Sequence, residues 1–306
     1  MFLKYLDLKL KKKLKRSLII LDKKAGITSH DEVFNLRKIF NIKKIGHSGT
    51  LDPKVTGILV CGIEKGTKVL EYILLSEKKY EAIFEFHEKI ERNIFEKTLR
   101  EFLGKINQLP PVKSSIKREE REREIYDLKV LKYDKNNRFA KVLCAVERGT
   151  YIRKLAHDIG LKIGINISMG DMERIQAGPF SFSNSNIINS DELKKIVYKF
   201  NKTKNIFIKF FNYLKIIKYL YPIEQLFFRE DKIKKIYIKK EAVKYIKSGN
   251  PLRFKNLKNK KYFEELKMGE TIAIFYKKEI LAIGKIFENI DSVESEFEII
   301  KLNKVF

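Results

Sequence analysis

A glycine-rich loop at residues 44–57 constrains the fold of this chain more than any other stretch of its sequence. It contains Gly46, Gly49 and Gly57, and it places Asp52 and Pro53 between two apolar runs. Glycine adopts backbone conformations with positive φ that other residues avoid, and proline pushes the residue before it towards extended geometry. The loop is therefore suited to hold a carboxylate rigidly for chemistry, although a structural turn with a solvated aspartate is the commoner use of such a composition.

The charge of the chain favours a polyanionic partner. Its 306 residues include 65 Lys and Arg against 39 Asp and Glu, a net charge of +26. Nucleic acid and an anionic membrane surface both attract such an excess. The sequence contains no run of about 18 apolar residues, the length that spans a bilayer, so we expect no membrane partner and take nucleic acid as the first candidate. Abundant Lys, Ile and Asn are typical of an AT-rich coding sequence, so charge alone is weak evidence.

Cysteine and histidine usage argues against a metal site and a disulfide, and the glycine pattern argues against a nucleotide cofactor. Cys61 and Cys144 lie in apolar, strand-like runs, which predicts buried free thiols. The four histidines lack the spacing of metal-binding motifs. No glycine-rich phosphate-binding loop follows a predicted strand, and the lysine-rich N-terminus lacks the apolar core of a signal peptide. We therefore expect an intracellular, soluble protein that needs no metal or cofactor.

The patterning divides the chain into three parts. Residues 1–16 form a basic, amphipathic segment, which is either a short surface helix or an arm that touches RNA. Residues 17–226 contain enough strand and helix patterns for one large domain. Beyond a linker at 229–231, residues 233–303 show short strands at turn spacing, which predicts a compact β-barrel.

Within the large domain, apolar periodicity predicts strands and helices in alternation. Thr28 or Ser29 is suited to cap a helix whose first turn contains Asp31 and Glu32. The other predicted elements are strands at 17–21, 58–63, 79–86, 125–133 and 138–146, and helices ending near 75 and at 94–106, 152–161 and 191–226. The smaller unit is predicted to have strands at 235–238, 271–276, 280–286 and 296–302 and a helix at 240–247.

Three separated pieces of the chain are candidates to form one site. They are Asp52 on its loop, Tyr80 at the start of an alternating strand, and Tyr151-Ile152-Arg153 at the start of a helix. A tyrosine ring stacks on a base that has left its helix, and an arginine orients a carboxylate. Taken singly, each residue also fits a purely structural role, with Tyr80 in the core or at its rim and Arg153 on a helix surface.

Five motifs, in order along the chain, resemble those of the TruB-type pseudouridine synthases. The sequence of the glycine-rich loop is similar to the form of this motif in the dyskerin branch of that family. The similarity covers about residues 17–225, and residues 233–303 are more weakly similar to a PUA domain. The five motifs are Asp22-Lys23-Lys24-Ala25-Gly26-Ile27-Thr28-Ser29-His30, Gly46-His47-Ser48-Gly49-Thr50-Leu51-Asp52-Pro53-Lys54-Val55-Thr56-Gly57, Lys79-Tyr80-Glu81, Gly149-Thr150-Tyr151-Ile152-Arg153-Lys154-Leu155 and Arg174-Ile175-Gln176-Ala177-Gly178-Pro179-Phe180.

The branch is indicated by residues 109–118 and by Phe86-His87, which resemble the RNA-guided archaeal and eukaryotic enzymes. The bacterial stand-alone tRNA enzymes have a longer insertion after the Tyr80 strand, which this chain lacks. Eukaryotic dyskerins usually add long Lys-rich tails, and this sequence stops at Phe306 without one. We therefore expect an archaeal, cytoplasmic protein, with a nucleolar location as the alternative for a eukaryotic source.

Three positions depart from the family pattern. Lys24 stands where proline is usual, and Met172 stands where a leucine usually packs under the target base. Glu173-Arg174 replaces a common pair of arginines. None of these changes removes Asp52, so they bear on packing rather than on the chemistry.

The resemblance implies an α+β pseudouridine synthase fold, with a mixed, largely antiparallel central sheet flanked by helices and a small C-terminal PUA-like β-barrel. It implies isomerisation of uridine to pseudouridine in RNA without cofactor or metal. Asp52 would be the catalytic carboxylate. The implied substrate-binding residues are Tyr80, Tyr151, Arg153, His47 and Met172, with His47 contacting RNA or filling the space that the flipped base leaves.

The resemblance also implies partners. The leading interpretation is the catalytic subunit of a box H/ACA ribonucleoprotein that modifies rRNA, with guide RNA, a small Nop protein, a Gar protein and a kink-turn-binding protein. Some archaeal members also modify tRNA. The alternatives are a stand-alone synthase for the T-arm uridine of tRNA, and a non-catalytic RNA scaffold that has kept only the fold.

Overall fold

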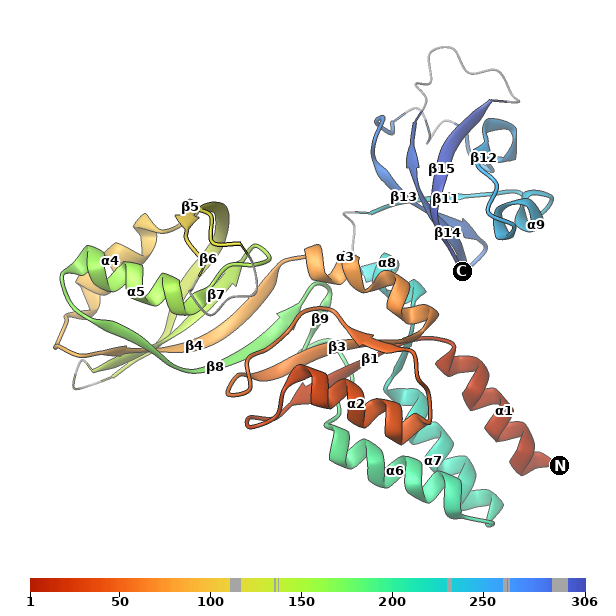
Figure 1. The fold of residues 1–306 in the computed structure, drawn as a ribbon, viewed down its shortest axis with the longest axis horizontal. Helices are drawn as coiled ribbons and strands as arrows, with labels where there is room; N and C mark the ends of the chain where they lie inside the picture. The colour runs from red at the N-terminus through yellow and green to blue at the C-terminus, as the bar shows by residue number, and fades with distance from the viewer. Residues whose placement is uncertain are drawn as a thin grey trace. The chain divides into compact units, whose positions relative to one another are not determined.

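The computed structural model describes residues 1–110, 117–134, 136, 138–229, 233–260, 263, 265–287 and 297–306. The chain forms two compact units, residues 1–220 and residues 221–306 (Figure 1). Residues 111–116 of the branch-indicating motif, the linker residues 230 and 231, and residue 296 of the last predicted strand lie outside the described residues.

The first unit is built on one large sheet with the strand order β1-β3-β8-β4-β7-β6-β5, in which β2 also pairs with β3 and β9 with β8. The β3–β8 pair is parallel, and the other pairs in this order are antiparallel. This confirms the predicted α+β class with a mixed, largely antiparallel sheet. The strands are β1 (Arg16–Lys23), β2 (Ile45–His47), β3 (Thr56–Glu64), β4 (Lys78–Phe86), β5 (Gly104–Gln108), β6 (Arg121–Tyr133), β7 (Phe139–Val146), β8 (Ile167–Ala177) and β9 (Phe180–Ser181).

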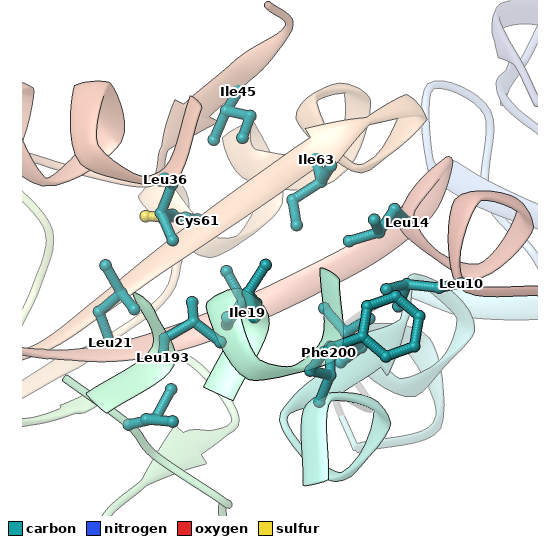
Figure 2. Packing of buried hydrophobic residues seen from close by; sticks show 14 of the residues in the cluster. Leu10, Leu14, Ile19, Leu21, Leu36, Ile45, Cys61, Ile63, Leu193 and Phe200 are labelled. Atoms are coloured by element: carbon teal, nitrogen blue, oxygen red, sulfur yellow. The ribbon is translucent and has the colours of Figure 1, made fainter. Parts of the chain in front are cut away.

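Helices pack against two parts of this sheet and form two apolar cores. One core lies between β1, β3 and the helices α1, α2, α6 and α7, and Figure 2 shows Leu, Ile, Phe and Cys side chains that belong to it. The other core lies between β4, β6, β7, β8 and the helices α4 and α5. The helices are α1 (Phe2–Leu14), α2 (Ser29–Phe40), α3 (Leu70–Leu75), α4 (Arg92–Glu101), α5 (Ile152–Ile163), α6 (Ser190–Lys202) and α7 (Ile206–Lys218).

Local sequence signals explain where several of these elements begin and end. Thr28 caps α2 in a capping box, because its hydroxyl accepts from the N–H of Asp31 while the Asp31 carboxylate accepts from the N–H of Thr28. The helix predicted over 94–106 was too long. It ends at Glu101, and Gly104, at φ 85°, turns the chain into the strand β5.

The second unit contains a five-stranded sheet in the order β11-β13-β14-β15-β12. The β11–β13 pair is parallel and the other pairs are antiparallel, around an apolar core that includes Phe263, Ile274 and Ile299. A small β unit at this place was predicted. Its elements are α8 (Glu224–Arg229), β11 (Lys234–Tyr237), α9 (Ala242–Lys247), β12 (Leu252–Arg253), β13 (Thr271–Tyr276), β14 (Glu279–Ile286) and β15 (Glu298–Val305), and β10 (Leu220–Pro222) spans the boundary with the first unit in the sequence.

Candidate active site

One cavity of about 550 Å³ in the first unit brings the separated pieces together. Asp52 reaches it from the glycine-rich loop, Tyr80 from β4, and Met172 from β8. Tyr151 and Arg153 reach it from the start of α5. Five of the six site residues predicted from the sequence therefore line one cavity.

Asp52 and Arg153 form an open ion pair at this cavity. Arg153 Nη2 lies 3.5 Å from Asp52 Oδ2, and the two side chains are 64% and 61% exposed. An ion pair this exposed contributes only about 0–1 kcal/mol to stability. Its effect is to orient the carboxylate, which stays accessible to a substrate.

The backbone on both sides of Asp52 is held by buried polar side chains. The N–H of Leu51 donates to Ser29 Oγ at 2.8 Å, and Ser29 Oγ lies 3.2 Å from the Leu51 carbonyl, to which it donates. The fully buried Lys23 donates from Nζ to the carbonyl of Pro53 at 3.1 Å. Because the residues before and after Asp52 are both fixed, the backbone sets the position of Asp52, and Arg153 orients its exposed carboxylate.

The buried side chain of Arg174 joins the glycine-rich loop to the sheet. Its side chain is 2% exposed, and it donates from Nε to the Ile58 carbonyl at 2.8 Å and from Nη2 to the Gly49 carbonyl at 3.1 Å. Gly57, at φ +100°, pairs with Arg174 where β3 meets β8, and a Cβ on Gly57 would lie 2.4 Å from the Arg174 carbonyl oxygen. Only glycine fits there, so the loop requires this glycine for a close backbone approach as well as for its φ angle.

Lys78 is a buried lysine on the cavity wall. Its Nζ donates to the carbonyls of Ile73 at 2.8 Å and of Leu74 and Ser76 at 2.5 Å, which fixes the C-terminal end of α3. Burial lowers the pKa of the Lys78 ammonium to about 7, and the positive charge of Arg174 adds to this effect. Lys78 therefore supports the cavity wall by holding backbone carbonyls.

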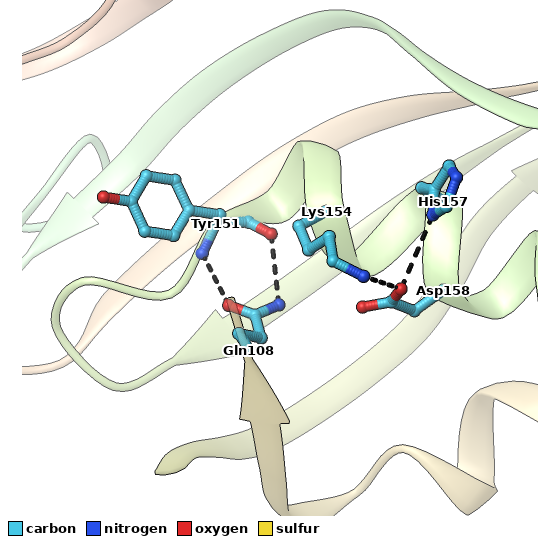
Figure 3. Close-up of polar contacts among 5 residues, drawn as sticks. All are labelled: Gln108, Tyr151, Lys154, His157 and Asp158. Carbon is cyan, nitrogen blue, oxygen red and sulfur yellow. Dashed lines mark hydrogen bonds and ion pairs between the residues drawn. The ribbon is translucent and has the colours of Figure 1, made fainter. Parts of the chain in front are cut away.

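The backbone of Tyr151 is held by Gln108, as Figure 3 shows. The N–H of Tyr151 donates to Gln108 Oε1 at 3.0 Å, and Gln108 Nε2 donates to the Tyr151 carbonyl at 3.3 Å. The Tyr151 ring points away from Gln108 in this view. Sequence reasoning missed Gln108, because it predicted a helix where β5 brings this buried amide to the start of α5.

His47 stands outside the set of described residues that line the cavity. Its Nδ1 accepts from the N–H of Gly49 at 3.2 Å, inside the glycine-rich loop. Burial lowers the pKa of the His47 imidazole, and the positive charge of Arg174 adds to this. The neutral ring that results is the form whose Nδ1 can accept this hydrogen bond. A contact between His47 and RNA stays a prediction.

The described residues contain no group of three or more His, Cys, Asp or Glu that could hold a metal ion. Cys61 and Cys144 are buried free thiols, and burial raises the pKa of each. No helix in the described ranges is long and apolar enough to cross a membrane.

The sequence is similar to curated archaeal proteins over most of its length. Residues 37–93 match the model of the TruB family pseudouridylate synthase N-terminal domain. The chain is 35% identical to a probable tRNA pseudouridine synthase B of Nanoarchaeum equitans, covering 89% of this chain and 73% of the relative. It is 34% identical to the protein of the same name from Sulfurisphaera tokodaii, covering 89% of this chain and 76% of the relative.

The fold is similar to solved structures of larger assemblies. A chain of a Cbf5-Nop10-Gar1 complex matches with a TM-score of 0.82 and 30% identity, covering 97% of this chain and 86% of the other. A chain of an H/ACA RNP bound to a substrate RNA containing 2′-deoxyuridine matches with a TM-score of 0.80 and 29% identity, covering 97% and 87%. With residues of four of its five motifs at one cavity, this chain belongs to the TruB family of pseudouridine synthases, in the branch of dyskerin and Cbf5.

Proposed function

We propose that Asp52 is the catalytic carboxylate of this pseudouridine synthase and that the enzyme works within a guide-RNA-directed ribonucleoprotein. The observation that supports the first part is the exposed Asp52–Arg153 pair on a cavity that Tyr80 also lines. The family reaction breaks the bond between N1 of uracil and C1′ of ribose and forms a bond from C5 to C1′. C5 loses a proton and N1 gains one, so the reaction is an isomerisation without oxidation or reduction.

The exposure of the Asp52 carboxylate supports an action on a nucleotide that has left its helix. The carboxylate serves either as a nucleophile, on the sugar or on the base, or as the group that abstracts a proton. Arg153 orients it in each case. The cavity, at about 550 Å³, lies in the size range of small-ligand sites, so a single nucleotide is a suitable occupant.

Tyr80 and Met172 are the proposed contacts of the target base. Extruding a base costs a few kcal/mol, and stacking on an aromatic ring returns about 1–3 kcal/mol. Tyr80 supplies that ring from β4, and Met172 supplies an apolar surface from the adjacent strand β8. The Tyr80 and Met172 side chains thus favour the extruded base over the stacked one.

The guided role is supported by the solved relatives, which are a Cbf5-Nop10-Gar1 complex and an H/ACA RNP with substrate RNA. We propose the same kinds of partners here: a box H/ACA guide RNA, rRNA as substrate, a small Nop protein, a Gar protein and a kink-turn-binding protein. The second unit, as a PUA-like module, would hold one end of the guide. The names of the curated relatives favour tRNA as a second substrate.

Tritium release from RNA labelled at C5 of uridine tests the catalytic assignment, because the C5 proton is lost in each turnover. We expect Asp52→Asn to abolish release while RNA affinity changes by less than about threefold. Asp171→Asn, at an exposed residue of β8, is the matched control and should release tritium at the wild-type rate. Normal turnover by the Asp52→Asn enzyme would show that another group is essential.

Reconstitution with and without guide RNA tests the guided role. We expect modification of an rRNA fragment only when guide RNA and the small partner proteins are present. Release from bare tRNA by the chain alone would favour the stand-alone role. Failure of the wild-type chain with every RNA and partner would favour the non-catalytic scaffold.

A further inference from the structure

The helix α7 presents its most regular apolar stripe to solvent. The stripe follows the i, i+3, i+4, i+7 spacing of one helix face, and Phe207 and Phe211 within it are 71% and 61% exposed. The opposite face, which is buried, includes two polar side chains. The stripe consists of Phe207, Phe210, Phe211 and Leu214, and the buried face consists of Lys209, Asn212, Tyr213 and Ile216.

Specific contacts fix α7 in this orientation. The buried Lys209 places its Nζ 2.8 Å from Asp7 Oδ1 on α1 and 4.6 Å from the centre of the Phe200 ring. Asn212 Nδ2 donates to the Ile208 carbonyl of the same helix at 2.8 Å. Rotating the stripe inward would expose the buried core residue Ile216 and break the Lys209–Asp7 pair. The packing of the first unit therefore holds the stripe towards solvent.

The helix α1 packs beside α7 in the first unit (Figure 1). Its buried leucines face the core, while Phe2, Tyr5 and Leu8 are exposed. The Phe2 ring lies 6.5 Å from the Phe210 ring, which joins the two helices' apolar residues. We call this surface the α1–α7 face, and it comprises Phe2, Tyr5, Leu8, Phe207, Phe210, Phe211 and Leu214. Ring contacts join Tyr5, Phe2, Phe210 and Phe211 into one exposed apolar cluster within this face. Exposed apolar clusters are typical of interaction sites.

The charges around the α1–α7 face indicate the chemistry of its partner. The sequence of α1 has five lysines and one acidic residue, Asp7, which pairs with Lys209. The sequence of α7 has three lysines and no acidic residue. A second copy of this face would be repelled, whereas acidic side chains would be attracted.

The apolar residues favour a protein over RNA as the occupant. Bases stack on aromatic rings, but Leu8 and Leu214 offer no ring and cannot hydrogen-bond to a phosphate. An amphipathic helix places apolar side chains at the same i, i+3, i+4, i+7 spacing as α7 and packs them between its ridges. Acidic residues beside that stripe would meet the lysines of α1 and α7.

We propose that the α1–α7 face binds an amphipathic helix of a partner protein, with an apolar stripe flanked by acidic residues. The seven face residues all lie outside the described set that lines the catalytic cavity. The interaction is therefore separate from the proposed catalytic function, and its test does not depend on that function.

The test uses the full-length chain and a designed fluorescent peptide. The peptide is helical, with leucines at i, i+3, i+4 and i+7 and glutamates beside them, and a scrambled peptide of identical composition is its control. By fluorescence anisotropy we expect saturable binding of the designed peptide only. Phe207→Ser with Phe211→Ser should weaken it about tenfold or more, and Lys215→Glu should weaken it less and reduce its salt dependence.

Several results would overturn the proposal. One is equal binding of the two peptides, or equal binding by the wild type and the double variant. A dimer seen by sedimentation that the double variant abolishes would assign the face to a second copy. Loss of binding to polyuridine RNA, or to vesicles of phosphatidylcholine and phosphatidylserine, in the double variant without loss of peptide binding would assign it to RNA or to membrane. The variants should melt like the wild type, because the substituted side chains face solvent.

Discussion

The glycine-rich loop and the α1–α7 face both reverse the usual placement of side chains, but in different ways. At the loop, the charged side chains of Lys23 and Arg174 are buried. On α7, Phe207 and Phe211 are exposed while Lys209 is buried. Each reversal costs free energy unless a compensating partner is present.

The partners of the two regions differ. Lys23 and Arg174 find backbone carbonyls of the loop and of β3, so their burial serves to position Asp52. The exposed rings of α7 have Phe2 beside them and solvent beyond. A buried cation whose carbonyl partners lie within the chain indicates a self-contained site, whereas an ordered apolar surface facing solvent indicates a site completed by another molecule.

The largest loss in the free energy of unfolding is expected from Gly57→Ala, which changes the glycine-rich loop. The new Cβ would meet the Arg174 carbonyl at 2.4 Å and would also sit at φ +100°. Backbone strain of about 1–2 kcal/mol and overpacking of about 1–3 kcal/mol add together. Urea denaturation should show a loss of about 2–5 kcal/mol in the free energy of unfolding, with loss of tritium release.

Gly104→Ala is the matched control for this change. Gly104 has a similar φ of +85°, but a Cβ there meets nothing within 4 Å. It should cost only the strain of about 1–2 kcal/mol and leave catalysis intact. Equal losses at the two positions would show that the close approach of β3 to β8 does not matter.

Arg174→Met is expected to have the next largest effect. It removes the donors to the Ile58 and Gly49 carbonyls and leaves both acceptors unsatisfied, which costs about 2–4 kcal/mol. Both stability, from urea denaturation, and tritium release should fall. Arg153→Met, which breaks only the exposed pair with Asp52, should lower release while stability changes by about 1 kcal/mol or less. The opposite pattern would reverse the roles assigned to the two arginines.

Sequence reasoning predicted the parts of this molecule that depend on local patterns. The strands β3, β4 and β7, the Thr28 cap and the convergence of Asp52, Tyr80 and Arg153 follow from periodicity and from ordered motifs. It did not predict that α4 ends at Glu101 and that Gly104 turns the chain into β5, because apolar residues on both sides of this glycine continue a helical pattern.

The contacts between distant segments were beyond such patterns. Nothing near Arg174 in the sequence indicates that its guanidinium reaches Ile58 and Gly49, and nothing near Gln108 indicates that it holds the backbone of Tyr151. The orientation of α7 was equally hidden, because this helix has apolar residues all around. Contacts with distant residues, such as the Lys209–Asp7 pair, and the burial of Tyr213 and Ile216 decide which face turns inward.

His47 is expected to make a smaller, pH-dependent contribution to the free energy of unfolding. Burial lowers the pKa of the folded imidazole below its ordinary value of 6.5, so the unfolded chain binds more protons between the two pKa values. The contribution of His47 to stability is therefore complete above about pH 6.5 and is lost as the pH falls through the folded pKa. Protonation also removes the acceptor for the Gly49 N–H.

His47→Asn isolates this effect, because the amide oxygen can accept from Gly49 without titrating. Urea denaturation at pH 7.5 and pH 5.5 should show a larger loss for the wild type than for the variant, by less than the Arg174→Met effect. If both proteins lost the same free energy, other groups would account for the acid sensitivity of the loop.

The smallest change in the free energy of unfolding is expected on the α1–α7 face, from Phe211→Ser alone. Its ring is 61% exposed, so the free energy of unfolding should change by about 0.5 kcal/mol or less and tritium release should not change. Tyr213→Ser, two residues along the same helix at a buried position, is the control and should cost about 3 kcal/mol or more. A large loss for Phe211→Ser would mean that the stripe supports the fold itself. In that case the face would resemble the glycine-rich loop, as a surface whose partner lies within the chain.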